Sequence, residues 1–369
     1  MHINNFELER YFAKHEFETE YLLSCSDCDG YSLKYVLEQA NESELKLWNE
    51  LTLGYTESQG HPALRQSISH LYEDMSPDNV LVMSPGELNF AFMHAFLKRG
   101  DHVISILPAY QSLYEVAHTI GCDVSFWEPD PAKWYFDPSD LKNLIKTNTK
   151  LLILNFPNNP TGAMPSMDDM NEIIAIARKH GLFIFSDEMY ARLTIREGHE
   201  LPPMTDVYER AFSLWGVSKS FGLAGLRIGW LVGRDQPILE TIQGIRDYLS
   251  ICNSAPSEIL SLIALNHKEA FIKPNVKKIQ TNLSLFEDYV ETRTNLFEFA
   301  GPKAGSVGFV KCKLKEPTLS FSERMVRQSG VMTVPSEMFG YRSGYLRIGL
   351  GRRNFSEVLK KFDAFITGD

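Results

Sequence analysis

One lysine in this chain has the surroundings of an amine that reacts, not of one that only adds charge to the surface. Lys219 lies between two serines and precedes the apolar, glycine-rich run 221–226. A surface lysine normally has polar and charged neighbours, whereas here a single arginine, Arg227, follows eight residues later in a predicted strand. This setting favours a lysine that condenses with a carbonyl group to form a Schiff base.

Polar side chains also follow two of the predicted strands that come earlier in the chain than this lysine. They are Asn158 and Asn159 after the strand 150–155, and Asp187 and Tyr190 after the strand 182–186. Taken alone, the asparagines fit an ordinary turn and the aspartate fits a helix cap. Because ligands bind at the carboxyl ends of parallel strands, we expect these groups and the lysine to lie together.

The composition is that of a globular protein with a small-molecule substrate. A length of 369 residues favours about two domains, and 44% of the residues are hydrophobic and 23% charged. The net charge of -10 argues against a nucleic-acid partner, because binding phosphates requires clustered Lys and Arg.

The five cysteines indicate a reducing compartment, and we expect a cytoplasmic protein. Cys25 and Cys28 form a C-x-x-C pair, but no second pair completes a zinc site, so no metal is expected. The first twenty residues have no apolar core and do not resemble a signal peptide. No stretch is long enough to span a bilayer, so no membrane partner is expected.

The alternation of short apolar runs and amphipathic stretches predicts an α/β fold with a mostly parallel seven-stranded sheet. The predicted strands are 79–83, 102–106, 123–127, 150–155, 182–186, 211–215 and 227–232. The predicted helices between them are 62–73, 88–98, 112–120, 138–146 and 167–180.

Three parts of the chain differ in pattern. Residues 45–255 form the predicted large α/β domain, and residues 256–369 form a smaller α+β domain that begins with long, charged helical sequence. Residues 1–44 are too few to fold alone, and we expect them to pack on the small domain.

The chain resembles the fold-type I pyridoxal-phosphate (PLP) enzymes of the class I and II aminotransferase family over nearly its whole length. The matching segments are 55–65 with Tyr55 and Gly60, Pro108-Ala109-Tyr110, Asn158-Asn159-Pro160-Thr161-Gly162, Asp187-Glu188-Met189-Tyr190, Ser218-Lys219, Gly225-Leu226-Arg227-Ile228-Gly229 and Leu346-Arg347-Ile348. Within the family, segments such as 8–12 and 245–249 are most similar to capreomycidine synthase-like members.

The resemblance implies roles around the ring of pyridoxal 5'-phosphate. Lys219 carries the cofactor as a Schiff base and moves the α-proton of the substrate. Asp187 pairs with the pyridine nitrogen, which keeps it protonated. Asn159 and Tyr190 donate to the phenolate oxygen, and Tyr110 stacks on the ring.

The phosphate site implied by the resemblance departs from the usual family pattern in two places. The expected phosphate ligands are Ser84, Gly86, Ser218 and Arg227. Pro85 has no N–H group to donate, and Gly216 replaces a frequent Ser or Thr. We therefore expect the protein to offer the cofactor phosphate fewer hydrogen-bond donors than is usual in the family, and the phosphate still to bind.

Substrate and subunit contacts are also implied. Arg347, in an apolar strand-like setting, binds the substrate α-carboxylate, assisted by Asn159; a structural ion pair is the alternative role for this arginine. Tyr55 reaches the phosphate in a neighbouring subunit, which implies a homodimer with shared active sites. Arg352 and Arg353 lie in a polar turn and are expected to be solvated.

The resulting hypothesis is an aminotransferase that acts on an amino acid and a 2-oxo acid. The alternative is a PLP-dependent lyase or cyclase of the capreomycidine synthase type that acts at the β- or γ-carbon, because both reactions use the same cofactor residues. A minor alternative is a non-catalytic PLP-binding sensor.

Overall fold

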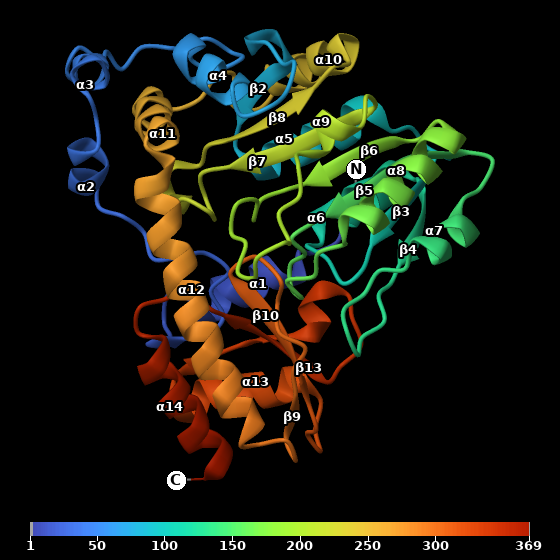
Figure 1. The fold of residues 1–369 in the computed structure, drawn as a ribbon, viewed down its shortest axis with the longest axis vertical. Coiled ribbons are helices and arrows are strands. Elements are labelled where there is room, and N and C mark those ends of the chain that lie inside the picture. The colour runs from blue at the N-terminus through green and yellow to red at the C-terminus, as the bar shows by residue number, and fades with distance from the viewer. Residues whose placement is uncertain (1–2, 369) are drawn as a thin grey trace.

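The computed structural model describes residues 3–368, and a seven-stranded sheet lies at the centre of its larger half (Figure 1). Its strands are β2 (Val80–Met83), β3 (His102–Ile106), β4 (Asp123–Trp127), β5 (Thr149–Asn155), β6 (Phe183–Asp187), β7 (Ala211–Gly216) and β8 (Gly229–Gly233). They are ordered β2-β8-β7-β6-β5-β3-β4. β8 is antiparallel to both neighbours, and the pairs from β7 to β4 are parallel. The predicted mostly parallel sheet is confirmed.

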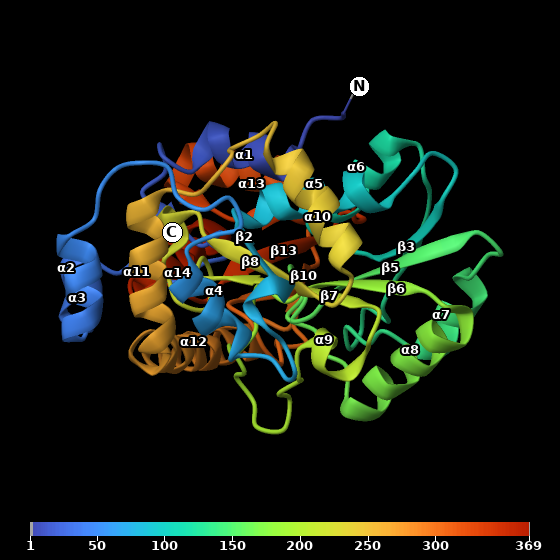
Figure 2. The same cartoon turned by 90° about the horizontal axis from the view of Figure 1, so that it is seen from above.

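Helices cover both faces of this sheet, which explains why its inner strands are mostly apolar and mostly buried. The covering helices are α4 (Pro62–Ser69), α5 (Pro85–Phe96), α6 (Ser112–Ile120), α7 (Pro138–Leu144), α8 (Met167–His180), α9 (Met204–Val207) and α10 (Gln236–Arg246). Figure 2 shows α5, α6 and α10 on one side of the sheet and α7, α8 and α9 on the other. A capping box at Ser166 begins α8, and Gly181, with φ of 64°, ends it.

One predicted strand begins too early. The sequence predicts a strand from Arg227, but β8 begins at Gly229, and Arg227 follows the 3-10 helix η2 (Ala224–Leu226) with φ of 56°. A non-glycine residue adopts this left-handed conformation only where its surroundings hold it. Here the Arg227 guanidinium donates to the carbonyl of Ala224 (3.0 Å). The prediction was wrong because an apolar run carries no sign of such a turn.

The smaller half contains an antiparallel sheet, as predicted for an α+β part. Its strands are β9 (Phe297–Glu298), β10 (Val307–Cys312), β12 (Val334–Pro335) and β13 (Tyr345–Gly349), ordered β12-β13-β10-β9. The accompanying helices are α12 (Lys268–Glu291), α13 (Thr318–Ser329) and α14 (Phe355–Thr367), and α11 (Ala255–Asn266) precedes them. In Figure 1 the long helix α12 extends along this half toward the central sheet.

The N-terminal segment crosses both halves. Its elements are α1 (Glu7–His15), β1 (Tyr21–Leu22), α2 (Leu33–Glu38) and α3 (Glu42–Asn49). α1 packs on the 3-10 helix η3 (Ser336–Phe339), and β1 pairs with β11 (Val331–Met332). The chain then follows β13, where the carbonyl of Leu23 accepts from the N–H of Gly349 (2.8 Å). α2 and α3 pack on α11.

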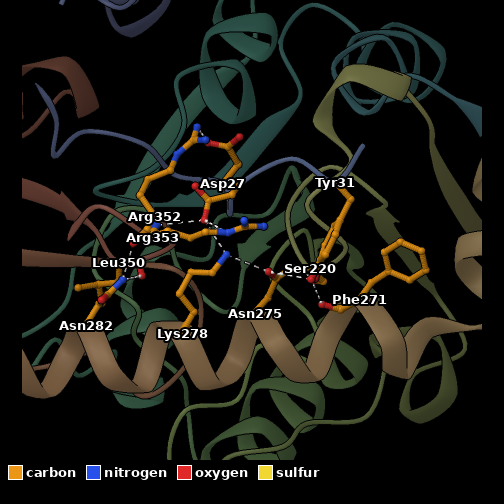
Figure 3. Close-up of polar contacts among 11 residues, drawn as sticks. Asp27, Tyr31, Ser220, Phe271, Asn275, Lys278, Asn282, Leu350, Arg352 and Arg353 are labelled. Atoms are coloured by element: carbon orange, nitrogen blue, oxygen red, sulfur yellow. Dashed lines mark hydrogen bonds and ion pairs between the residues drawn. The ribbon is translucent and has the colours of Figure 1, made fainter. Parts of the chain in front are cut away.

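One face of α12 holds several of these loops in place (Figure 3). Asn275 donates to the carbonyl of Ser220 (3.1 Å), directly after Lys219. Lys278 forms an ion pair with Asp29 of the N-terminal segment (2.7 Å). Asn282 donates to the carbonyls of Leu350 and Arg352 (2.9 and 2.8 Å). The three side chains are spaced to lie on one face of the helix. Through them α12 contacts the loop that contains Lys219, the N-terminal segment and the loop after β13.

Arg352 is not the solvated residue that the sequence predicted. Its guanidinium donates to the carboxylate of Asp27 (2.9 Å), and both side chains are about three-quarters buried. Arg353 is exposed and lies 3.6 Å from Asp29. A polar turn gave no sign of this pair because its acidic partner lies at the opposite end of the chain.

Candidate active site

A cavity of about 440 Å³ lies where the carboxyl ends of the central strands meet the N-terminal segment and β13. The predicted site residues that line it are Gly86, Tyr110, Asn159, Asp187, Tyr190, Ser218, Lys219, Arg227 and Arg347. Ser84 contacts this group through Arg227, whose guanidinium donates to its Oγ (3.3 Å). Tyr55 is 90% exposed and does not line the cavity.

Lys219 lies three residues beyond the end of β7 and is half-buried. Its Nζ donates to Ser26 Oγ over 2.8 Å. No ion pair joins Lys219 to a carboxylate within residues 3–368. The amine is therefore held by a neutral hydroxyl and faces the cavity, as a nucleophile requires.

Asp187 is the last residue of β6 and is 7% exposed. Burial raises the pKa of its carboxyl group to about 6, although the N–H of Met189 and the charge of Lys219 favour the ionised form. The Met189 N–H donates to Oδ1 over 3.1 Å. The ionised form of this buried carboxyl group would be stabilised by a ligand that places a cation or an N–H donor beside it.

Two buried hydroxyl groups at the cavity have no hydrogen-bond partner among the described residues 3–368. They are Tyr190 Oη and Ser218 Oγ, on side chains that are 2% and 5% exposed. A buried polar group without a partner costs about 1–3 kcal/mol. Both groups can donate to acceptor atoms of a ligand.

Arg347, on β13, is buried, and no carboxylate pairs with it in the part of the chain that the structure describes. It donates to Asn159 Oδ1 (3.1 Å) and to the carbonyl of Ser24 (2.6 Å), and its Nε has no partner. Its guanidinium lies over the rings of Phe12 and Phe339. Burial lowers its pKa, yet a guanidinium remains charged, so the position favours an anionic ligand.

A tight turn fixes Asn159 after β5. Asn155 Oδ1 accepts from the backbone N–H of Asn159 (2.9 Å). Asn158 Oδ1 accepts from the N–H and hydroxyl of Thr161 (3.2 and 2.6 Å). Because Asn159 Oδ1 is bound to Arg347, its amide nitrogen is left as a donor toward the cavity.

The predicted phosphate end lies at the start of α5. Ser84 precedes this helix, and Pro85 and Gly86 line the cavity. Backbone N–H groups at a helix N-terminus favour an anion, and Arg227 adds a positive charge beside them. Gly216 is required by packing, because a Cβ there would lie 2.8 Å from Gly229 Cα across the β7–β8 pair. The usual hydroxyl residue is thus excluded at this position.

The sequence did not single out the side chains that the N-terminal segment brings to the cavity. Glu9, Glu16 and Ser26 line it together with Asp27. Tyr110 Oη donates to Glu9 Oε1 over 2.6 Å, and burial raises the pKa of this phenol. Acidic residues spaced along one face of a short helix beside apolar ones were the available signal.

The structure provides no cluster for a metal and no membrane helix. Within residues 3–368, no group of three or more His, Cys, Asp or Glu side chains is placed to hold a metal ion. The thiols of Cys25 and Cys28 are free and buried, and burial raises the pKa of Cys28 to about 12. No helix among the same residues is long and apolar enough to cross a bilayer.

Comparison with known proteins identifies the family. The family described as aminotransferase class I and II matches residues 19–359. The chain belongs to this family. The predicted family and fold type are confirmed.

Individual class I and II relatives differ in their named reactions. The chain is 27% identical over 253 residues to capreomycidine synthase of Streptomyces vinaceus, covering 68% of this chain and 64% of that protein. It is 27% identical over 335 residues to a probable aspartate/prephenate aminotransferase of Rickettsia felis, covering 84% and 81%. A PLP-dependent aminotransferase from Streptococcus suis 89-1591 is 28% identical, with a TM-score of 0.92 and coverage of 100% of this chain and 98% of that chain. The chain therefore spans less than two thirds of the capreomycidine synthase that it matches.

The cavity of this aminotransferase-family chain fits pyridoxal 5'-phosphate, the cofactor on which the S. suis protein depends. The fit rests on complementary groups: a free amine for the aldehyde, a buried carboxyl for the pyridine nitrogen, and unpartnered hydroxyls for oxygen acceptors. A helix N-terminus and an arginine lie together for the phosphate.

We predict that Asp187→Asn stabilises the cofactor-free protein at neutral pH. The folded-state pKa of Asp187 is raised to about 6, so the folded state binds more protons than the unfolded state between about pH 4 and 6, and this carboxyl group lowers stability as the pH rises. The variant is expected to be equally stable near pH 4 and roughly 2–3 kcal/mol more stable above pH 6. Denaturant unfolding across this range measures the difference, and Asp288→Asn, on the exposed face of α12, is the control. A pH-independent difference would contradict the assignment.

Proposed function

We propose that this chain is a PLP-dependent aminotransferase that removes the amino group of an amino acid and transfers it to a 2-oxo acid. The observation that carries the proposal is a single cavity that holds a free amine, a buried acid and a buried, unpaired guanidinium, contributed by Lys219, Asp187 and Arg347. These three groups complement the reactive ends of the cofactor and of an α-amino acid.

When bound, pyridoxal phosphate supplies an aldehyde that condenses with amines and a protonated ring that withdraws electrons from the substrate α-carbon. Asp187 holds the ring nitrogen in its protonated form. Tyr190 and Asn159 would donate to the phenolate oxygen attached to the ring, and Tyr110 would cover the ring. Ser218, Arg227, Ser84 and the N–H of Gly86 hold the phosphate.

Arg347 orients the substrate through its carboxylate. Hydrogen bonds to Asn159 and Ser24 already fix the guanidinium. It therefore does not have to move when a substrate carboxylate binds. A carboxylate held there would keep the α-carbon in the cavity that Lys219 also lines. The amine then acts as the base at Nζ, and Ser26 Oγ positions it when it is not bound to carbon.

We predict that Lys219→Ala abolishes both the covalent attachment of the cofactor and the reaction. The expected loss of turnover is at least about 10³-fold, because nucleophile and base are removed together. Borohydride reduction followed by peptide mapping is expected to find the cofactor on the peptide containing Lys219 in the native protein and on no peptide in the variant. Lys360→Ala, an exposed lysine on α14, is the control. Label on any other lysine contradicts the assignment.

The second candidate is a lyase or cyclase that acts at the β- or γ-carbon, favoured by the similarity to capreomycidine synthase. A single turnover without a 2-oxo acid separates the two. Transamination is expected to release about one equivalent of the 2-oxo acid that corresponds to the substrate per site. Release of an eliminated or cyclised product, with the amino group retained or lost as ammonia, would instead identify the second candidate.

We also propose a homodimer in which Tyr55 of each chain reaches the cofactor phosphate of the other. Tyr55 and Leu53 are 90% and 85% exposed, and Tyr248 on the adjacent segment is 92% exposed. Ser58 binds Gln243 (2.7 Å), which holds the two segments side by side. Exposed aromatic and aliphatic side chains in one region are typical of a subunit interface.

The dimer leads to a prediction for Tyr55→Phe. Loss of one hydrogen bond to a phosphate is expected to weaken cofactor binding about 10- to 150-fold, since such a bond contributes about 1.5–3 kcal/mol. Equilibrium dialysis measures the affinity, and sedimentation measures the oligomeric state. Tyr248→Phe removes a phenol from the same surface and serves as the control. A monomeric holoenzyme would overturn the proposal.

The cytoplasmic location also remains a proposal. Its support is that the five cysteines are unpaired in the described chain. Recovery in another compartment after cell fractionation would contradict it.

A further inference from the structure

We propose that a second cavity, separate from the candidate active site, binds a small apolar α-amino acid as a ligand that is not the substrate. This cavity has a volume of about 240 Å³ and lies behind the turn 187–190. Among the described residues, its lining and that of the active site share none. The inference goes beyond the proposed function, because no step of that reaction uses this space.

The two cavities lie on opposite faces of the central sheet. At the end of β6, Asp187 lines the active site and Glu188 lines the second cavity, and on β7 Leu214 and Trp215 divide in the same way. Successive side chains of a strand point to opposite faces, which explains this division. The second cavity borders α8 and α9, whereas the active site borders α5 and α6, and Figure 2 shows these pairs of helices on opposite sides of the sheet.

Most of the wall of the second cavity is apolar. The apolar side chains come from several elements and include Leu71, Phe156, Met164, Met170, Leu201 and Trp215. An apolar wall with a few polar groups is typical of sites for small molecules. Because such sites usually measure roughly 300–1,000 Å³, this cavity suits a ligand of few atoms.

A buried carboxyl group faces this cavity. Glu188 is 8% exposed, and its Oε1 accepts from the N–H of Met204 (2.9 Å) and from the hydroxyl of Ser213 (2.7 Å). Burial raises the pKa of Glu188 to about 7, although these donors and the Ser186 hydroxyl favour the ionised form. An ammonium group beside the carboxyl would stabilise the charge that burial disfavours.

A guanidinium lines the same cavity. Arg192 has φ of 64°, a conformation that non-glycine residues rarely adopt, and its guanidinium carbon lies 5.6 Å from the centroid of the Trp215 ring. In the part of the chain that the structure describes, no carboxylate pairs with it. The position is therefore open to the carboxylate of a ligand.

The two charged groups lie at the same end of the cavity. Burial and the Glu188 carboxylate raise the pKa of Tyr72, and the Arg192 guanidinium opposes them, so both groups lie near this phenol. A ligand with an ammonium and a carboxylate on one carbon pairs with both charges and leaves its apolar side chain for the remaining wall. A simple anion or a simple cation leaves one of the two charges unpaired. Glu200, at the exposed rim, disfavours an acidic side chain.

The cavity adjoins the loop that contains Lys219 without opening into the active site. Trp215 Nε1 donates to Ser220 Oγ (3.4 Å), and this hydroxyl donates to the carbonyl of Ala191 (2.5 Å). Trp215 and Ala191 line the second cavity, and Ser220 follows Lys219 directly. A ligand here therefore contacts residues that hold the lysine loop and the turn 187–190 in place.

The test measures the binding of leucine by calorimetry. The PLP-loaded protein is first reduced with borohydride, so that an added amino acid no longer exchanges with the lysine in the active site. Isocaproate lacks the ammonium group of leucine and isoamylamine lacks its carboxylate, and each is expected to bind at least about 10-fold more weakly than leucine. Equal affinity for leucine and either analogue overturns the inference, as does a cavity that binds none of leucine, methionine and phenylalanine.

Variants locate the binding site. Arg192→Gln is expected to weaken leucine binding at least about 10-fold, because it removes the charge that holds the carboxylate. Leu201→Trp fills the cavity and is expected to abolish binding. Arg210→Gln removes the same charge from an exposed position outside the lining and is the matched control. Unchanged binding in both cavity variants, or an equal loss in the control, overturns the inference and leaves the proposed function intact.

Discussion

The structure depends on a guanidinium that is buried without a carboxylate beside it. Arg347 is 1% exposed, and within residues 3–368 it donates only to neutral acceptors, Asn159 Oδ1 and the carbonyl of Ser24. A buried charge costs several kcal/mol unless it is paired, so the fold encloses a position that demands an anion. Because these residues belong to the small sheet, the turn after β5 and the N-terminal segment, the same two hydrogen bonds join the three parts that form the cavity.

The other groups of the cavity follow the same rule. Asp187 is buried where its charge is disfavoured, and Tyr190 and Ser218 have hydroxyl groups without partners. Each group lowers the stability of the protein when it has no partner. Each is stabilised by a ligand that supplies a positive charge or a hydrogen-bond partner. These buried groups lower the free energy of unfolding of the protein. A ligand that pairs with them recovers this free energy, which then contributes to its binding at the proposed reaction site.

The sequence predicted those parts of the fold and site that depend on local pattern. The predicted ranges of β3, β4, α6 and α8 match the structure, because apolar runs and capping residues act over a few residues. Asn159, Asp187 and Lys219 could be placed together, since parallel strands bring their carboxyl ends to one edge. The turn at Arg227, the Arg352–Asp27 pair and the approach of Glu9 and Glu16 to the cavity depend on packing between distant segments, which no local pattern records.

The N-terminal segment is the part of the site that can differ without altering the shared chemistry. Lys219, Asp187 and Arg347 address atoms that every α-amino acid and the cofactor possess, so they set neither the side chain nor the fate of the substrate carbanion. α1 lines the same cavity, and the chain that follows it is held in place where Cys25 passes Gly349, at which a Cβ would overlap the Cys25 carbonyl. The relatives that the chain resembles are named both for transamination and for capreomycidine synthesis, so groups that act only on the cofactor and the α-carbon do not distinguish these reactions.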